Sequence, residues 1–157
     1  MAKVKLDKID RIIIRELLEN GRMTNVELAE KAGISAPPCL RRVRALEEND
    51  IIKGYHAKVN AAALGYTVTV FAHVGLENQH DDELRKFENL VSTWDMVREC
   101  FITAGDSDFL LKVVAKDWDD YQNFLTRTLT SAPNVRQVKS MMAVKSSKHK
   151  PGVPVES

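Results

Sequence analysis

Apolar residues in the first part of the chain recur at intervals of three and four, the spacing of residues on one face of an α-helix. One such run follows Asp7 and ends at Asn20. A second begins at Thr24, three residues before Glu27 in a capping-box arrangement, and a third begins after Ser35. The residues predicted to be buried are Ile9, Ile12, Ile13, Leu17 and Leu18 in the first helix, Val26, Leu28, Ala29 and Ala32 in the second, and Leu40, Val43 and Leu46 in the third.

Two adjacent prolines, Pro37 and Pro38, lie close to the start of the third run. Backbone amides in the first turn of a helix have no intrahelical partner, and the fixed φ of proline suits that turn. The prolines therefore mark a helix start, and we expect the Ser35 side chain to cap it.

The second and third runs are separated by a short segment at Gly33, which is expected to end the second helix. Two short helices joined by a tight turn form a helix-turn-helix, whose second helix can enter the DNA major groove. An ordinary helical hairpin within a core is the alternative. If the pair binds DNA, the residues expected at the interface are Ser35, Ala36, Pro37, Arg41, Arg42 and Arg44.

After residue 65 the pattern changes to short β-branched and aromatic runs that alternate with helical spacing. The order is strand, helix, strand, strand, helix, strand, which is the split βαβ arrangement of ferredoxin-like domains. The predicted strands are 67–76, 96–103, 109–115 and 135–144, and the predicted helices are 81–90 and 118–130.

The segment between these two patterns, 51–59, is predicted to be extended, as a wing or a connecting strand. The last residues hold two prolines, a glycine and little apolar content, so we expect them to be mobile. The predicted fold class is α+β, an N-terminal winged helix-turn-helix followed by a C-terminal ferredoxin-like βαββαβ domain. The predicted division is a DNA-binding domain at 1–50, a connecting strand or linker at 51–65, an effector-binding and oligomerisation domain at 66–144, and a tail at 145–157.

Composition is ordinary for a soluble globular protein, with 44% hydrophobic and 29% charged residues. No apolar run is long enough for a membrane span and no signal peptide is evident, so a cytoplasmic protein is expected. Residues 1–60 hold 12 Lys and Arg against 9 Asp and Glu, whereas residues 61–144 hold 8 against 12. Of these two parts only the first is basic, which favours contact with phosphate there. We expect both cysteines, Cys39 and Cys100, to be buried and reduced.

A Gly-Asp-Ser-Asp turn, residues 105–108, interrupts two apolar strands. A plain hairpin would explain it, because Gly and Asp are turn formers. Alternatively, Asp106 or Asp108 pairs with a cation while the amides around Gly105 bind a carboxylate, which together describe the head of a free amino acid. Met141 is either core or interface filler or part of an adaptable apolar pocket.

The four histidines show no metal-ligand spacing with each other or with the cysteines, so no metal site is predicted. No nucleotide-binding loop or nucleophile elbow occurs, and no base accompanies the paired carboxylates. The sequence therefore predicts neither an enzyme nor a cofactor. An enzyme or small-molecule carrier built on the ferredoxin-like half is the competing class.

Five segments together make the chain resemble the Lrp/AsnC, or feast/famine, regulators: LDKIDRIIIREL, NVELAEKAGISAPPCLRRVRALE, IIKGY, GDSDFLLKV and APNV. The resemblance implies a ferredoxin-like domain that binds small effectors, and dimers that commonly assemble into octamers. It also implies that Gly105, Asp106 and Asp108 form an effector loop between dimers. Relatives often separate Pro37 from Pro38 by one residue, so we expect altered sequence preference. The Pro-Cys-Leu run at residues 38–40 resembles the leucine-responsive branch and favours a hydrophobic amino acid as effector.

We therefore predict a sequence-specific transcriptional regulator that binds double-stranded DNA, with a free amino acid shifting its oligomer or its DNA affinity. A dimer would set two recognition helices into successive major grooves, about 34 Å apart. The alternative is an architectural DNA-binding protein that needs no ligand.

Overall fold

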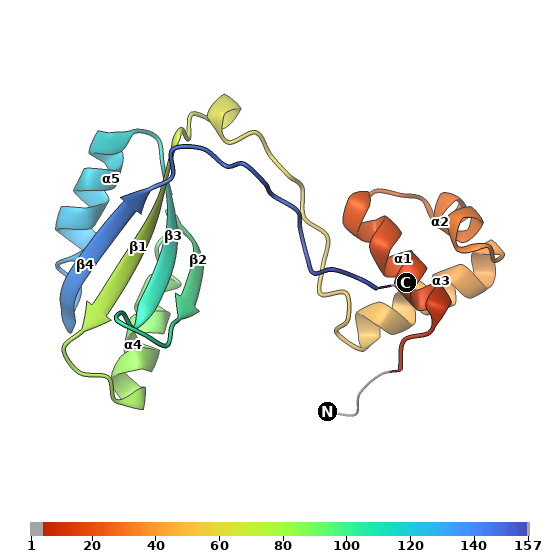
Figure 1. Ribbon diagram of the computed structural model, residues 1–157, viewed down its shortest axis with the longest axis horizontal. Helices are drawn as coiled ribbons and strands as arrows, with labels where there is room; N and C mark the ends of the chain where they lie inside the picture. The colour runs from red at the N-terminus through yellow and green to blue at the C-terminus, as the bar shows by residue number, and fades with distance from the viewer. Residues whose placement is uncertain (1–4, 157) are drawn as a thin grey trace. The chain divides into compact units, whose positions relative to one another are not determined.

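The computed structural model describes residues 5–156 and divides the chain into two compact units (Figure 1). The first holds the residues up to Lys58 together with the segment from Lys148 on, and the second is Val59–Ser147. The first contains helices α1 (Lys8–Glu19), α2 (Asn25–Ala32) and α3 (Ala36–Glu48). The second contains the short 3₁₀ turn η1 (Ala62–Leu64), β1 (Val68–Leu76), α4 (Asp81–Val91), β2 (Val97–Ile102), β3 (Phe109–Ala115), α5 (Trp118–Phe124), the π-helical turn η2 (Leu125–Leu129) and β4 (Val135–Met142).

The first two helices start with complete capping boxes. The Asp7 carboxylate accepts from the backbone N–H of Asp10, whose own carboxylate accepts from the Asp7 N–H. Thr24 and Glu27 make the same reciprocal pair at the start of α2, as the sequence predicted. Gly33, with φ +69°, ends α2 in the left-handed conformation that glycine adopts without strain.

The core of the first unit lies where the three helices meet, but two residues predicted to be buried are exposed. Val26 is 69% exposed and Leu40 is 39% exposed. Both predictions were wrong. Val26 lies two residues before the buried Leu28 and Leu40 lies next to the buried Cys39, so each fits the local spacing of apolar residues although its side chain is exposed. The buried residues are Ile13, Leu28, Ala29, Ala32, Cys39 and Leu46.

Residues 51–60 run on from α3 as neither helix nor strand, so the predicted connecting strand is not formed there. The Tyr55 hydroxyl donates to Glu47 Oε1 of α3 at 2.8 Å, and burial together with Glu47 raises the pKa of Tyr55 to about 12. The C-terminal segment groups with the first unit, where Lys150 Nζ lies 4.0 Å from Glu19 Oε1. Its mobility stays a prediction.

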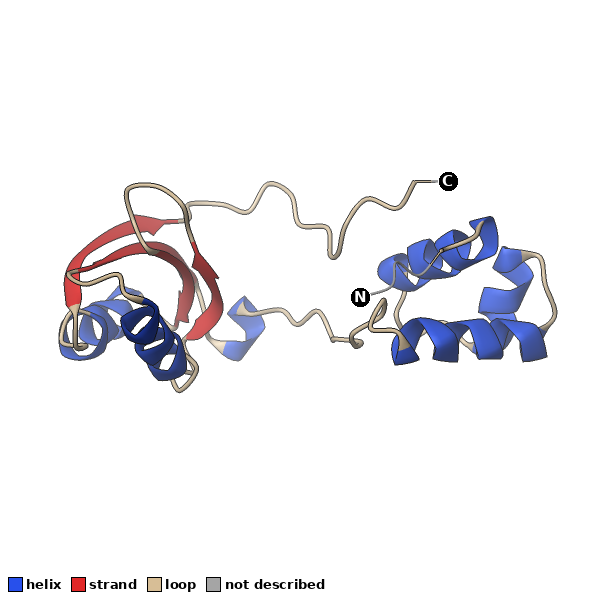
Figure 2. Cartoon of the chain, turned by 90° about the horizontal axis from the view of Figure 1, so that it is seen from below, coloured by secondary structure: helices blue, strands red, loops and turns tan. Residues whose placement is uncertain are grey.

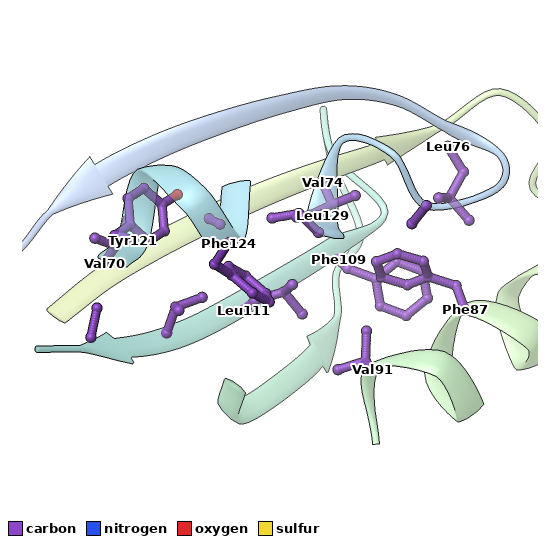
Figure 3. Close-up of a cluster of buried hydrophobic side chains, with 14 residues drawn as sticks. Val70, Val74, Leu76, Phe87, Val91, Phe109, Leu111, Tyr121, Phe124 and Leu129 are labelled. Atoms are coloured by element: carbon purple, nitrogen blue, oxygen red, sulfur yellow. The ribbon is translucent and has the colours of Figure 1, made fainter. Parts of the chain in front are cut away.

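The second unit is one four-stranded antiparallel sheet, in the order β2-β3-β1-β4, with α4 and α5 on the same face (Figures 1 and 2). This is the predicted ferredoxin-like arrangement. Alternate residues of the central strands point toward the helices, and the Phe87 and Phe109 rings pack 4.7 Å apart between centroids (Figure 3). The fully buried residues of this core include Val70, Val74, Leu76, Phe109, Leu111, Val113, Tyr121 and Leu129.

The two cysteines differ in exposure. Cys39 is fully buried in the first unit, whereas Cys100 is exposed on β2. The prediction of two buried thiols was therefore wrong for Cys100, because β2 is an edge strand of the sheet. Within residues 5–156, no helix combines the length and apolar character needed to span a membrane.

Candidate functional site

Helix α3 carries two stripes of side chains on opposite sides, each with members three, four and seven residues from its first. Successive residues of a helix are rotated by about 100°, so two such stripes offset by two residues face in opposite directions. The inner stripe, Cys39, Arg42, Val43 and Leu46, is buried or half-buried. The outer stripe, Pro37, Leu40, Arg41 and Arg44, is exposed.

Arg42 is held within the first unit. Its Nη1 lies 2.8 Å from Asp7 Oδ2 and 2.7 Å from Asp10 Oδ1, the two carboxylates of the α1 capping box. The Asp10 backbone N–H and then the Arg42 guanidinium lower the pKa of Asp7, and the two carboxylates raise the pKa of Arg42. Arg42 therefore ties α3 to the start of α1.

Arg41 and Arg44 are situated differently from Arg42. Both side chains are exposed, and within the described part of the chain neither lies within 4.0 Å of a carboxylate oxygen. A guanidinium presents five N–H donors in a planar fork that matches phosphate oxygens or the O6 and N7 atoms of guanine. The outer stripe thus offers two free forks to a ligand outside the chain.

Ser35 is the N-cap residue of α3, but its hydroxyl makes no capping hydrogen bond within the described residues. An N-cap side chain accepts from the backbone N–H of the second or third helical residue, and in α3 these are Pro37 and Pro38, which have none. The prediction that Ser35 caps the helix was therefore wrong. The hydroxyl is exposed and available as a donor or an acceptor beside the outer stripe.

Asn25, which the sequence did not single out, fixes where α3 begins. It is the first residue of α2, and its Nδ2 donates to the backbone carbonyl of Ala36 at 2.8 Å. This bond joins the N-termini of α2 and α3. No sequence signal marks it, because the two residues are eleven positions apart.

The loop between β2 and β3 is anchored at its second half. The Asp108 N–H donates to the Val74 carbonyl at 2.9 Å, and Asp108 Oδ2 accepts from the Leu76 N–H at 2.7 Å. Thr103 Oγ1 donates to the Ser107 carbonyl at 2.7 Å, and the Ser107 hydroxyl lies 3.2 Å from His73 Nδ1 on β1. Asp108 therefore closes the end of β1, where its pairing with β4 is irregular between Gly75 and Leu76.

The first half of the same loop is open. Gly105 and Asp106 are exposed, and a Cβ built on Gly105 would meet no described atom within 4 Å. Met141 is not brought to this loop within one chain. It is 47% exposed and pairs with Phe71, three residues along β1 from Val74, which is roughly 10 Å away along the strand.

Across residues 5–156, no group of three or more His, Cys, Asp or Glu side chains is placed to hold a metal ion. The guanidinium and hydroxyl groups on α3, and the carboxylate and backbone amide groups in the loop, can form hydrogen bonds and ion pairs with a ligand.

A helix-turn-helix with free arginines, followed by a ferredoxin-like domain with an open acidic loop, defines a DNA-binding protein with a second, ligand-binding domain. Comparison with known families agrees with this class. Residues 6–53 match the winged helix-turn-helix DNA-binding model, and residues 69–153 match the Lrp/AsnC ligand binding domain. The chain belongs to the Lrp/AsnC family of transcriptional regulators.

Individual relatives are similar over nearly the whole chain. A leucine-responsive regulatory protein of Rhizobium meliloti is 49% identical over 148 residues, which are 94% of this chain and 95% of the relative. The Bkd operon transcriptional regulator of Pseudomonas aeruginosa is 45% identical and covers 90% of this chain and 93% of its own length. A transcriptional regulator of Neisseria meningitidis, solved as its L-Met complex, is 34% identical with a TM-score of 0.90, covering 96% and 97% of the two chains.

Proposed function

We propose that this chain is a sequence-specific regulator of transcription that binds double-stranded DNA in the cytoplasm and responds to a free hydrophobic amino acid. Family membership supports the class of function. The observation that carries the proposal for this chain is the outer stripe of α3, where two exposed guanidinium groups have no ion-pair partner among the described residues.

In the proposed complex, the outer face of α3 enters the major groove. Arg41 and Arg44 contact guanine edges or phosphates, and the Ser35 hydroxyl and the backbone at Ala36 contact a phosphate. Pro37 packs its ring against the groove and holds the start of the helix rigid. Because Pro37 and Pro38 have no N–H to donate to the Ser35 hydroxyl, this hydroxyl can contact the DNA without first breaking a capping bond.

Arg42 is assigned a different role from its neighbours. Its ion pairs with Asp7 and Asp10 make it a positioning residue that sets α3 against α1, and Asn25 does the same for the start of α3. Placement matters here, because a bidentate contact tolerates little error in the position of the helix.

For the effector, we propose that Asp106 pairs with the ammonium group of an amino acid while backbone N–H groups near Gly105 bind its carboxylate. The exposure of Asp106 and the open space beside Gly105 support this assignment. Asp108, whose Oδ2 is bound to the Leu76 N–H, holds the loop in shape. The relative solved with L-Met makes methionine and leucine the first amino acids to test.

The loop lies in the second unit and the outer stripe of α3 lies in the first, so an effect of the amino acid on DNA binding has to be relayed between the units. We propose a dimer that assembles further, up to an octamer, in which the amino acid contacts more than one copy and Met141 lines the side-chain pocket from a neighbouring copy. A coupling free energy of about 1 to 3 kcal/mol between effector and DNA is typical of such regulators.

The DNA part is tested by selecting duplexes from a random library with the full-length protein and measuring affinity by fluorescence anisotropy. We expect a preferred sequence, a two-fold symmetric site, and affinity that falls steeply as salt rises. Selection of no preferred sequence would instead favour an architectural DNA-binding protein.

The effector part is tested by thermal shift and calorimetry with each of the twenty amino acids. A hydrophobic amino acid should stabilise the wild-type protein, and Asp106→Asn should abolish that response while the matched variant Asp95→Asn, exposed before β2, keeps it. A full response in Asp106→Asn would show that the carboxylate does not hold the ligand.

A further inference from the structure

The outer stripe of α3 contains one branched aliphatic side chain, Leu40, beside the ring of Pro37 and the two guanidinium groups. Leu40 is 39% exposed, whereas its neighbour Cys39 is fully buried and Leu46 is 4% exposed. It lies one turn from Pro37 and from Arg44 on the same face of the helix. This apolar side chain therefore sits among the groups that the proposed function directs toward DNA.

The major groove offers an apolar partner at only one kind of base. Guanine, cytosine and adenine present hydrogen-bonding atoms there, and thymine alone adds a methyl group at C5. A guanidinium group can hydrogen-bond to guanine or phosphate, but a methyl group offers it no acceptor. A leucine on the same stripe as two arginines would complete the readout of a sequence that contains thymine.

We propose that Leu40 contacts thymine C5-methyl groups in the major groove and so selects thymine at defined positions of the site. This inference rests on the proposed function, because it requires the outer stripe of α3 to face DNA. It goes further by giving one residue a specificity role that the arginines cannot perform.

The charge on the stripe favours DNA over a second copy of the chain as the partner of Leu40. A symmetric contact between two copies through this face would bring Arg41 and Arg44 of one copy close to the same residues of the other. Within the described residues no carboxylate lies within ion-pair distance to neutralise them. Like charges brought together in this way oppose the contact, whereas phosphates flanking the groove attract the same groups.

The test uses the full-length protein and a duplex selected from the random library. Each thymine is replaced in turn by deoxyuridine, which lacks only the methyl group, and affinity is measured for the wild type, for Leu40→Ala and for Val26→Ala. Val26 is the matched control, because it is an exposed apolar residue on α2 outside the stripe. Thermal melting and sedimentation confirm that all three proteins are folded and equally assembled.

We expect deoxyuridine at one or two positions in each half-site to weaken the wild type and Val26→Ala by about fourfold, the effect of one methyl group removed from an apolar contact. Leu40→Ala should bind the thymine and deoxyuridine duplexes equally. The inference is overturned if no position is sensitive, if Leu40→Ala keeps the sensitivity, or if Leu40→Ala changes the assembly and leaves the sensitivity intact. A selection that yields no preferred duplex overturns the proposed sequence-specific function as well, which separates the two failures.

Discussion

The two sides of α3 use the same residue type for different purposes. Arg42, on the inner stripe, is bound by two carboxylates of α1, whereas Arg41 and Arg44, on the outer stripe, have no carboxylate within reach among the described residues. Arg41 and Arg42 are adjacent in sequence and differ only by about 100° of helix rotation. Position around the helix, and not residue type, therefore separates the groups that hold the fold from those available to a ligand.

The largest effect is expected on the outer side. Arg41→Ala and Arg44→Ala should each weaken binding to the selected duplex by about 1 to 3 kcal/mol and leave the melting temperature nearly unchanged. Anisotropy titrations and thermal melts of the same samples measure both quantities. Equal affinity for all three proteins would show that the outer stripe does not read DNA.

On the inner side, Arg42→Ala should destabilise the first unit by about 1 kcal/mol, because it leaves two carboxylates of the α1 capping box unpaired. Denaturant unfolding followed by circular dichroism measures this loss. Arg42→Lys, which keeps the charge but not the fork, should recover part of the stability. The distinction between the two sides fails if Arg42→Ala leaves the free energy of unfolding unchanged and weakens DNA binding as much as Arg41→Ala does.

The N-caps extend the comparison to the helix starts. Ser35→Ala should weaken DNA binding about threefold, as expected for one neutral hydrogen bond, with a stability change within about 0.5 kcal/mol, since no capping bond is lost. Thr24→Ala, which breaks a formed capping box, should instead cost about 1 kcal/mol of stability. Equal loss of stability in both variants would mean that Ser35 caps α3 in solution.

The smallest effect concerns pH. The pKa of Asp7 in the folded chain is lowered from the ordinary value of 3.8, so its contribution to stability is present above that value and is lost as pH falls through the lower folded pKa. Asp7→Asn removes this contribution. In thermal melts from pH 6 to pH 2, the melting temperature of the wild type should exceed that of the variant at pH 6. The two melting temperatures should converge below about pH 4. A constant difference across that range would assign the stabilisation to uncharged hydrogen bonds.

Much of the fold follows from local signals in the sequence. The capping boxes at Asp7 and Thr24 and the break at Gly33 mark helix ends through the hydrogen bonds of a few neighbouring residues. The run of residues 109–115 is predicted and observed as a strand with the same bounds, because a short apolar run lies between the turn residues 105–108 and the polar pair Lys116 and Asp117.

The features that the sequence did not reveal depend on partners far along the chain. Arg42 looks like its neighbours until the fold brings Asp7 and Asp10 to it, 35 and 32 residues away. The exposure of Cys100 depends on the order of strands in the sheet, which local patterns do not determine. By contrast, the sequence alone does indicate that Ser35 makes no capping bond, because Pro37 and Pro38 lack the N–H that such a bond requires.

The contrast between the two thiols provides a built-in probe of local opening. Cys100 is accessible in the folded chain, and Cys39 lies at the centre of the three helices and contacts reagent only when they separate. A maleimide dye should therefore add once quickly and a second time at the rate of opening of the first unit. The second rate therefore reports how often the three helices open in the full-length protein.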